Sequence, residues 1–115
     1  MNCASTVRVT WAIAYAVACL ACRDAAAAES ASKPQTHTIT IEAMQFQPAS
    51  LTVHRGDRIV WRNTDLVPHT ATARGTFDSG SIAPGASWAY VAEKAGALSY
   101  VCTFHPTMKA TLAVQ

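Results

Sequence analysis

The feature that most constrains the fold is a series of short segments that alternate polar and apolar side chains and are separated by turn residues. In the first of them, residues 36–42, threonines alternate with Ile39 and Ile41, which is the period of a strand with one buried face. Pro48, Gly56-Asp57 and Pro84-Gly85 mark turns between such segments. Further strands are expected at residues 51–54, 58–63, 70–73, 88–91, 98–102 and 109–114.

No window of the sequence has the period of a long amphipathic helix, and no internal repeat is found. Seven or eight short strands at regular spacing are typical of an antiparallel β-sandwich closed by Greek-key connections. The sequence therefore predicts an all-β fold of this class.

The first 28 residues are left out of the fold argument because they have the pattern of a signal peptide. A basic start with Arg8, an apolar run and a tract of small residues ending at Ala28 match its three parts. A membrane anchor is the weaker interpretation, since the run is shorter than the roughly 20 apolar residues that span a bilayer, and Arg23 and Asp24 close it. Cleavage is expected after Ala28, with lipidation at Cys22 as the open alternative.

Three segments follow from this division: a signal peptide at 1–28, a flexible arm at 29–35 and one folded domain at 36–115. The chain without its leader has 87 residues, with seven Lys or Arg and six Asp or Glu. It is nearly neutral and has no basic stripe, so nucleic acid is not expected as a partner. The signal peptide indicates an exported, periplasmic protein, and the small size of the folded domain favours a monomer.

Removing the leader leaves Cys102 as the only cysteine of the chain. An exported domain normally pairs its thiols, so a lone one needs an explanation. One explanation is a buried cysteine that packs as a small hydrophobe. The other is a metal ligand, and His105 and Met108 favour it because all three donors fall within seven residues. Pro106 argues against a helix here, so a folded loop is expected to gather them.

Thiolate, imidazole and thioether are soft ligands that suit copper, whereas magnesium, calcium or manganese would require oxygen ligands. Zinc would prefer a second thiolate or more histidines. One cysteine, two histidines and a weak axial methionine are associated with blue copper electron transfer. The second histidine is expected to be His69, which follows Pro68 in a loop after a strand end, because His37 and His54 lie on strands and are expected to be exposed.

From about Thr36 to Val114 the sequence resembles the cupredoxin family, and within it the short-loop amicyanin type, with plastocyanin and pseudoazurin as relatives. The order and spacing of several landmarks carry this resemblance: Val53 before Gly56-Asp57, Trp61-Arg62-Asn63, Pro68-His69, Pro84-Gly85, and Tyr100-Val101-Cys102-Thr103 leading to His105-Pro106 and Met108.

The resemblance implies that His69, Cys102 and His105 form a trigonal set of strong ligands and that Met108 is a long axial contact. It also implies that Asn63 and Thr103 form a pair that ties the strand end to the ligand loop.

The sequence departs from the amicyanin pattern at Phe104, where proline is typical, at Thr107, where an aromatic residue is typical, and at Thr70, where asparagine is frequent. His105 is expected to expose a ring edge for electron transfer, within an apolar surround that includes Phe104, Pro106 and Pro68.

These observations predict a mononuclear blue copper protein that cycles one copper ion between Cu(I) and Cu(II) for periplasmic redox partners. The resemblance suggests a dehydrogenase donor and a cytochrome c acceptor. An enzyme is not expected, because no Ser-His-Asp set or pair of carboxylates stands out. Two alternatives remain open: a copper-binding or copper-trafficking protein, and a metal-free interaction sandwich in which Cys102 and Met108 only pack in the core.

Overall fold

A computed structural model of the chain describes residues 32–115. The predicted signal peptide and the first residues of the predicted arm lie outside the described residues. Residues 32–115 form strands and contain no helix, and thus no helix that is long and apolar enough to cross a membrane. The strands are β1 Thr36–Glu42, β2 Gln45–Gln47, β3 Ser50–Val53, β4 Arg58–Asn63, β5 Thr72–Ala73, β6 Phe77–Asp78, β7 Ser87–Val91, β8 Gly96–Val101 and β9 Lys109–Val114.

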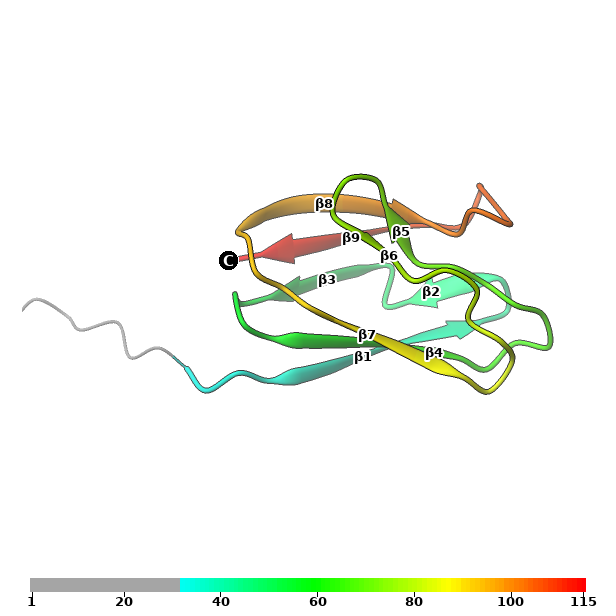
Figure 1. Cartoon of the computed structure of the whole chain (residues 1–115), viewed down its shortest axis with the longest axis horizontal. Coiled ribbons are helices and arrows are strands. Elements are labelled where there is room, and N and C mark those ends of the chain that lie inside the picture. Colours follow the sequence, from blue (N-terminus) through cyan, green and yellow to red (C-terminus); the bar gives the residue numbers. More distant parts are fainter. Residues whose placement is uncertain (1–31) are drawn as a thin grey trace, which may run out of the picture. The chain divides into compact units, whose positions relative to one another are not determined.

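The strands form two sheets, with the orders β2-β1-β4-β7 and β3-β9-β8-β5-β6 (Figure 1). The predicted all-β sandwich is therefore confirmed. The sheets are not purely antiparallel as predicted: each is mixed, because β1 pairs with β4 in parallel and β3 pairs with β9 in parallel. Neither parallel pair joins strands that are consecutive in the chain. Between β1 and β4 the chain crosses to the other sheet for β3 and returns, and β3 pairs with the last strand, β9. A strand that returns in this way does not form a hairpin with its neighbour.

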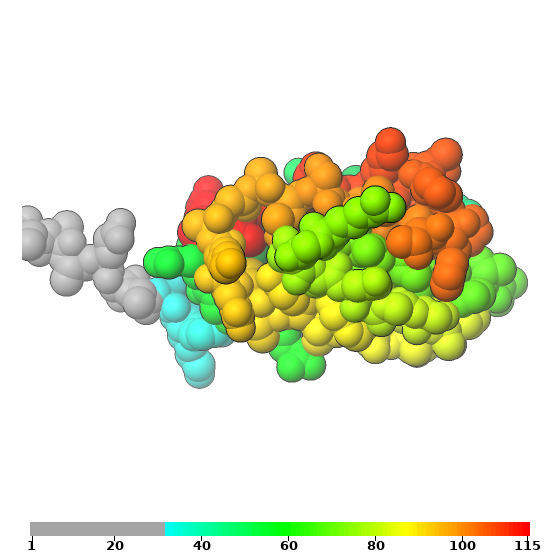
Figure 2. All heavy atoms as spheres, turned by 45° about the horizontal axis from the view of Figure 1, so that its top comes forward, coloured from blue at the N-terminus to red at the C-terminus, as the bar shows by residue number. Residues whose placement is uncertain are grey.

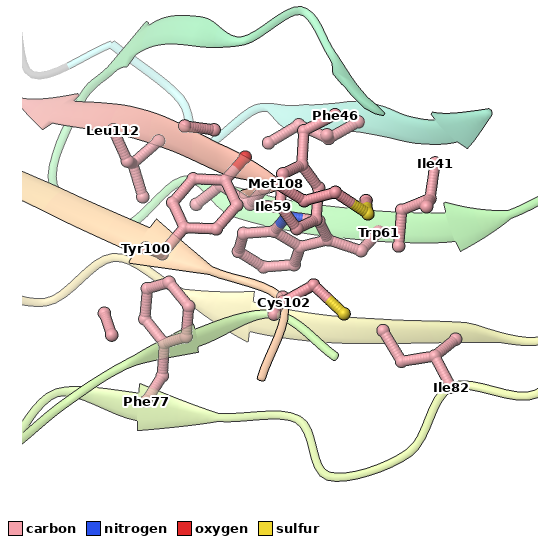
Figure 3. Packing of buried hydrophobic residues seen from close by; sticks show 14 of the residues in the cluster. Ile41, Phe46, Ile59, Trp61, Phe77, Ile82, Tyr100, Cys102, Met108 and Leu112 are labelled. Carbon is pink, nitrogen blue, oxygen red and sulfur yellow. The ribbon is translucent and has the colours of Figure 1, made fainter. Parts of the chain in front are cut away.

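Aromatic side chains fill the core between the sheets (Figure 3). Trp61 of β4 is fully buried, and its ring centroid lies 5.5 Å from that of Tyr100 on β8 and 5.2 Å from that of Phe77 on β6. Phe46 of β2 meets Tyr100 edge to face at 4.8 Å. Burial raises the pKa of the Tyr100 hydroxyl to about 12. Each such side chain contributes about 1.5–3 kcal/mol through the area that it removes from water.

The turn between β3 and β4 is organised by the buried carboxylate of Asp57. It accepts the backbone N–H groups of Gln35 at 2.9 Å and of His54 at 3.0 Å, and it lies 2.8 Å from His37 Nε2. These hydrogen bonds lower the pKa of Asp57 to about 2, and the bond from Gln35 has the largest effect, followed by those from His54 and His37. His37 is thus tied to the turn, whereas His54 is exposed as expected.

The opposite end of β4 meets the end of β8. The register of the β8–β9 hairpin sets Val101 against Lys109, so residues 102–108 form the connection that closes it. The segment between β4 and β5 reaches the same place, since the backbone N–H of Thr70 lies 3.3 Å from Cys102 Sγ. The β4–β5 connection, which crosses between the sheets, and the β8–β9 connection therefore meet at one end of the sandwich.

Candidate metal centre

Backbone hydrogen bonds fold residues 102–108 into a tight loop. His105 N–H donates to Cys102 O at 3.2 Å, Met108 N–H donates to His105 O at 2.9 Å, and Cys102 N–H donates to Met108 O at 3.1 Å. These bonds link the three predicted donor residues to one another. Pro106 is exposed in this loop, where its missing N–H costs nothing.

His69 is held by a second set of backbone bonds, in the connection between β4 and β5. Its N–H donates to Ile82 O at 3.1 Å, and Ile82 N–H donates to His69 O at 2.7 Å, which is an isolated antiparallel bridge. The side chain of His69 is completely buried. The bridge fixes the backbone from which the ring reaches Cys102.

The donor atoms converge on one point. His69 Nδ1 and His105 Nδ1 each lie 3.7 Å from Cys102 Sγ, and the two ring centroids are 5.1 Å apart. Bonds of about 2.0 Å to nitrogen and about 2.3 Å to sulfur, meeting at a trigonal angle, would separate the donors by about 3.7 Å. The three residues are thus spaced to hold one metal ion.

Met108 is buried immediately before β9, at the end of the loop, and brings a fourth donor. In Figure 3 the sulfur atoms of Met108 and Cys102 both point toward the same end of the core. One thiol, two imidazoles and one thioether form a soft set that fits copper better than the oxygen-seeking cations. The arrangement suits one copper ion.

Asp65 orients His69, and sequence reasoning missed it. Its Oδ2 lies 2.8 Å from His69 Nε2, so Nε2 carries the ring proton and Nδ1 is free to bind a metal. The carboxylate also accepts the N–H groups of Ala43 at 2.7 Å and Met44 at 3.0 Å. Burial raises the pKa of Asp65, but the hydrogen bonds from Met44, His69 and Ala43 outweigh it and lower the pKa below 3.8. The signal that could have found it is an acid four residues before a candidate ligand.

Asn63 does not pair with Thr103. Its Nδ2 donates to Val67 O at 2.8 Å and to Ile82 O at 2.9 Å, and its Oδ1 accepts Asp65 N–H at 2.9 Å. Asn63 therefore braces the His69 connection from the β4 side. The expected direct tie to the ligand loop is not formed, because the Asn63 amide is occupied by Val67 and Asp65 of its own connection and by Ile82 of the β6–β7 connection.

Thr70 makes the tie to the ligand loop instead. Its Oγ1 accepts the backbone N–H of Thr103 at 2.8 Å and lies 3.0 Å from Thr103 Oγ1. Its backbone N–H donates to Cys102 Sγ. One buried threonine thus holds both the ligand loop and the ligand sulfur, at a position where amicyanin-type sequences frequently have asparagine.

Exposed apolar side chains occur in both connections that form the site. Phe104 is 52% exposed beside the half-buried His105, and Leu66 in the β4–β5 connection is 94% exposed. Pro68 and Pro106 are also exposed. In Figure 2 the ligand loop, coloured orange-red, and the green connection lie at the same end of the molecule. This end offers apolar surface around the site.

A two-sheet sandwich with a Cys-His-His-Met donor set at one end defines a small protein of the single-copper class. The chain belongs to the cupredoxin-like domain family, whose match covers residues 12–114. The resemblance seen in the sequence is therefore confirmed.

Amicyanins are among the similar proteins. Amicyanin from Paracoccus versutus is 24% identical over 83 residues, which cover 67% of this chain and 63% of that protein, so the chain spans less than two thirds of this relative. A crystal structure of amicyanin from Paracoccus versutus is 26% identical, with a TM-score of 0.64, over 70% of this chain and 81% of that one. A Cu(I) structure of an amicyanin mutant is 22% identical, with a TM-score of 0.67, over 70% and 82% of the two chains.

Proposed function

We propose that this chain is a mononuclear blue copper protein that carries single electrons. The observation that carries the proposal is the pair of imidazole nitrogens, each 3.7 Å from one buried thiol sulfur. The proposed ligands are His69, Cys102, His105 and Met108. The bound copper would supply the one-electron chemistry, by alternating between Cu(I) and Cu(II).

The residues around the site favour electron transfer because they hold the donors in one arrangement. The bridge to Ile82 and the hydrogen bond to Asp65 fix His69 on both sides. The backbone bonds of the ligand loop fix His105 and Met108. Donors that cannot move far between oxidation states reduce the rearrangement that each transfer requires.

Electrons would enter and leave at the half-buried ring of His105, which is the ligand nearest to solvent. Phe104, Pro106 and Pro68 are exposed and would surround it with apolar contact surface. Redox partners form small and short-lived interfaces, often below about 1,200 Å² in total, so a patch of this kind is sufficient.

The expected setting is the periplasm, with residues 1–28 as an export signal, 29–35 as an arm and 36–115 as the copper domain. The proposed partners are redox proteins, with a dehydrogenase donor and a cytochrome c acceptor suggested by the likeness to amicyanin. The carrier is proposed to act as a monomer and to catalyse no reaction of its own.

Repeated redox cycles test this function against the copper-trafficking alternative. The purified protein would be loaded with copper, reduced with ascorbate and reoxidised with ferricyanide through many cycles, in the presence of a Cu(I) chelator of comparable affinity. An electron carrier keeps its copper and regains its colour in each cycle. Progressive transfer of Cu(I) to the chelator would instead support a trafficking protein.

A further inference from the structure

A row of hydroxyl groups leads from the ligand loop to a carboxylate on β6. Thr70 Oγ1 lies 3.0 Å from Thr103 Oγ1 and 3.1 Å from Thr72 Oγ1. Thr72 Oγ1 lies 3.1 Å from Asp78 Oδ1, in the strand pair where these two residues face each other. The row therefore connects Thr103, next to Cys102, with Asp78.

The protons of this row can be assigned by counting. A threonine hydroxyl has one proton to donate and two lone pairs to accept with, whereas an ionised carboxylate only accepts. Thr72 Oγ1 is the donor in both of its contacts, so its single proton is shared between Asp78 Oδ1 and Thr70 Oγ1. The bond to Asp78 is charge-assisted and is the stronger of the two.

The same count fixes the remaining groups. Thr70 Oγ1 accepts from the hydroxyl of Thr72 at 3.1 Å and from the backbone N–H of Thr103 at 2.8 Å, which uses both of its lone pairs. Its own proton is therefore directed to Thr103 Oγ1, at 3.0 Å. The bonds from Thr72 to Thr70 and from Thr70 to Thr103 thus run in one direction, toward the ligand loop, and hydrogen bonds aligned in this way strengthen one another.

We propose that Asp78, acting through Thr72 and Thr70, is a positioning residue for the copper site. The carboxylate holds the hydroxyl of Thr72 in place, and Thr72 donates to Thr70 Oγ1 and supports its side chain against the ligand loop. The backbone N–H of Thr70 is thereby kept on Cys102 Sγ at 3.3 Å. This inference rests on the proposed copper function, but the hydrogen-bond row itself can be tested without metal.

Thr72→Val is the decisive variant, because it keeps the shape of the side chain and the charge of Asp78 while it breaks the row. Thr72→Ser restores the hydroxyl and is the rescue variant. Thr52→Val on β3 is the matched control, since Thr52 is exposed and its side chain has no hydrogen bond within residues 32–115. Asp78→Ala removes the anchor itself.

The first measurement is amide hydrogen exchange in the metal-free proteins, followed by NMR. Thr72→Val and Asp78→Ala are expected to speed exchange at the Thr70 and Thr103 amides several-fold, whereas Thr72→Ser and Thr52→Val leave it unchanged. Unchanged exchange at both amides in folded Thr72→Val would overturn the proposal. A protein that binds no copper would refute the proposed function and leave this measurement valid.

The second measurement is the midpoint potential of the copper-loaded proteins. An N–H group on the sulfur withdraws charge from the thiolate and favours the reduced ion, so a looser Thr70 lowers the potential. We expect up to a tenfold shift of the redox equilibrium toward Cu(II), which is ~59 mV for one electron. If the Asp78 charge acted only through its electric field, Asp78→Ala would raise the midpoint potential and Thr72→Val would leave it unchanged. Either of those results would refute the proposal.

Discussion

Replacing Asp65 by alanine removes three hydrogen bonds that join the β1–β2 turn to His69, a proposed copper ligand. The carboxylate lies 2.8 Å from His69 Nε2 and accepts the N–H groups of Ala43 and Met44. His69 is fully buried, so its orphaned ring N–H costs about 1–3 kcal/mol. Water can replace the carboxylate at the exposed turn, so those two bonds add only about 1 kcal/mol. The sum is about 3 kcal/mol.

Urea unfolding of the metal-free, reduced protein at neutral pH measures this loss, provided that the transition is two-state. Asp65→Asn is expected to lose about half as much, because its amide oxygen can still accept. Glu93→Ala is the matched control: this exposed acid has no hydrogen bond or ion pair within the described residues, so it should change stability by less than about 0.5 kcal/mol. An Asp65→Ala protein within about 0.5 kcal/mol of the parent would refute the reasoning.

The pH dependence of the same experiment has a definite sign. The pKa of Asp65 is lower in the folded protein than its usual 3.8, so its contribution is fully present above that value. It is lost as the pH falls through the folded pKa. The difference in free energy of unfolding between the parent and Asp65→Ala should therefore become smaller in acid.

Three further predictions concern separate parts of the molecule. Ala43 has a φ of 50° in the β1–β2 turn, where glycine is unstrained, so Ala43→Gly should raise the free energy of unfolding by about 0.5–1 kcal/mol. This appears as a higher urea midpoint, and a lower midpoint would contradict the prediction. Asp57→Asn should be less stable than the parent at neutral pH, and the difference in their free energies of unfolding should disappear as the pH falls from about 4 toward the folded pKa of about 2. A difference that does not change with pH would show that the carboxylate charge is not responsible. Met108→Gln should keep a coloured site with a lower midpoint potential in a spectroelectrochemical titration, and an unchanged potential would remove Met108 from the ligand set.

The strands that the sequence predicted best are those with a long polar–apolar alternation. β1, β4 and β9 have the expected bounds because one face of each is buried, along the whole of β4 and β9 and at Ile39 and Ile41 in β1. β2 and β6 were not expected, since three and two residues are too few to show a period. Phe77 lies in a stretch of glycine, serine and proline that indicated a loop, yet pairing of β6 with β5 carries it into the core.

The residues of the candidate site also differ in how well the sequence predicts them. Cys102, His105 and Met108 could be predicted because their chemistry and spacing are visible within seven residues. The supports of the site could not be, because they depend on how the β4–β5 connection folds. Asp65 reaches His69 and the β1–β2 turn together, and Thr70 takes the place beside Thr103 that was expected for Asn63.

Titration of the reduced, metal-free protein with Cu(II) tests the central claim most directly. One equivalent of copper should bind and give the intense blue absorption of a cysteine-ligated copper site, and Cys102→Ser should stay colourless under the same conditions. The donor spacing of 3.7 Å between Cys102 Sγ and each histidine nitrogen is the basis of this expectation. A parent protein that binds no copper, or a Cys102→Ser variant that turns blue, would contradict it.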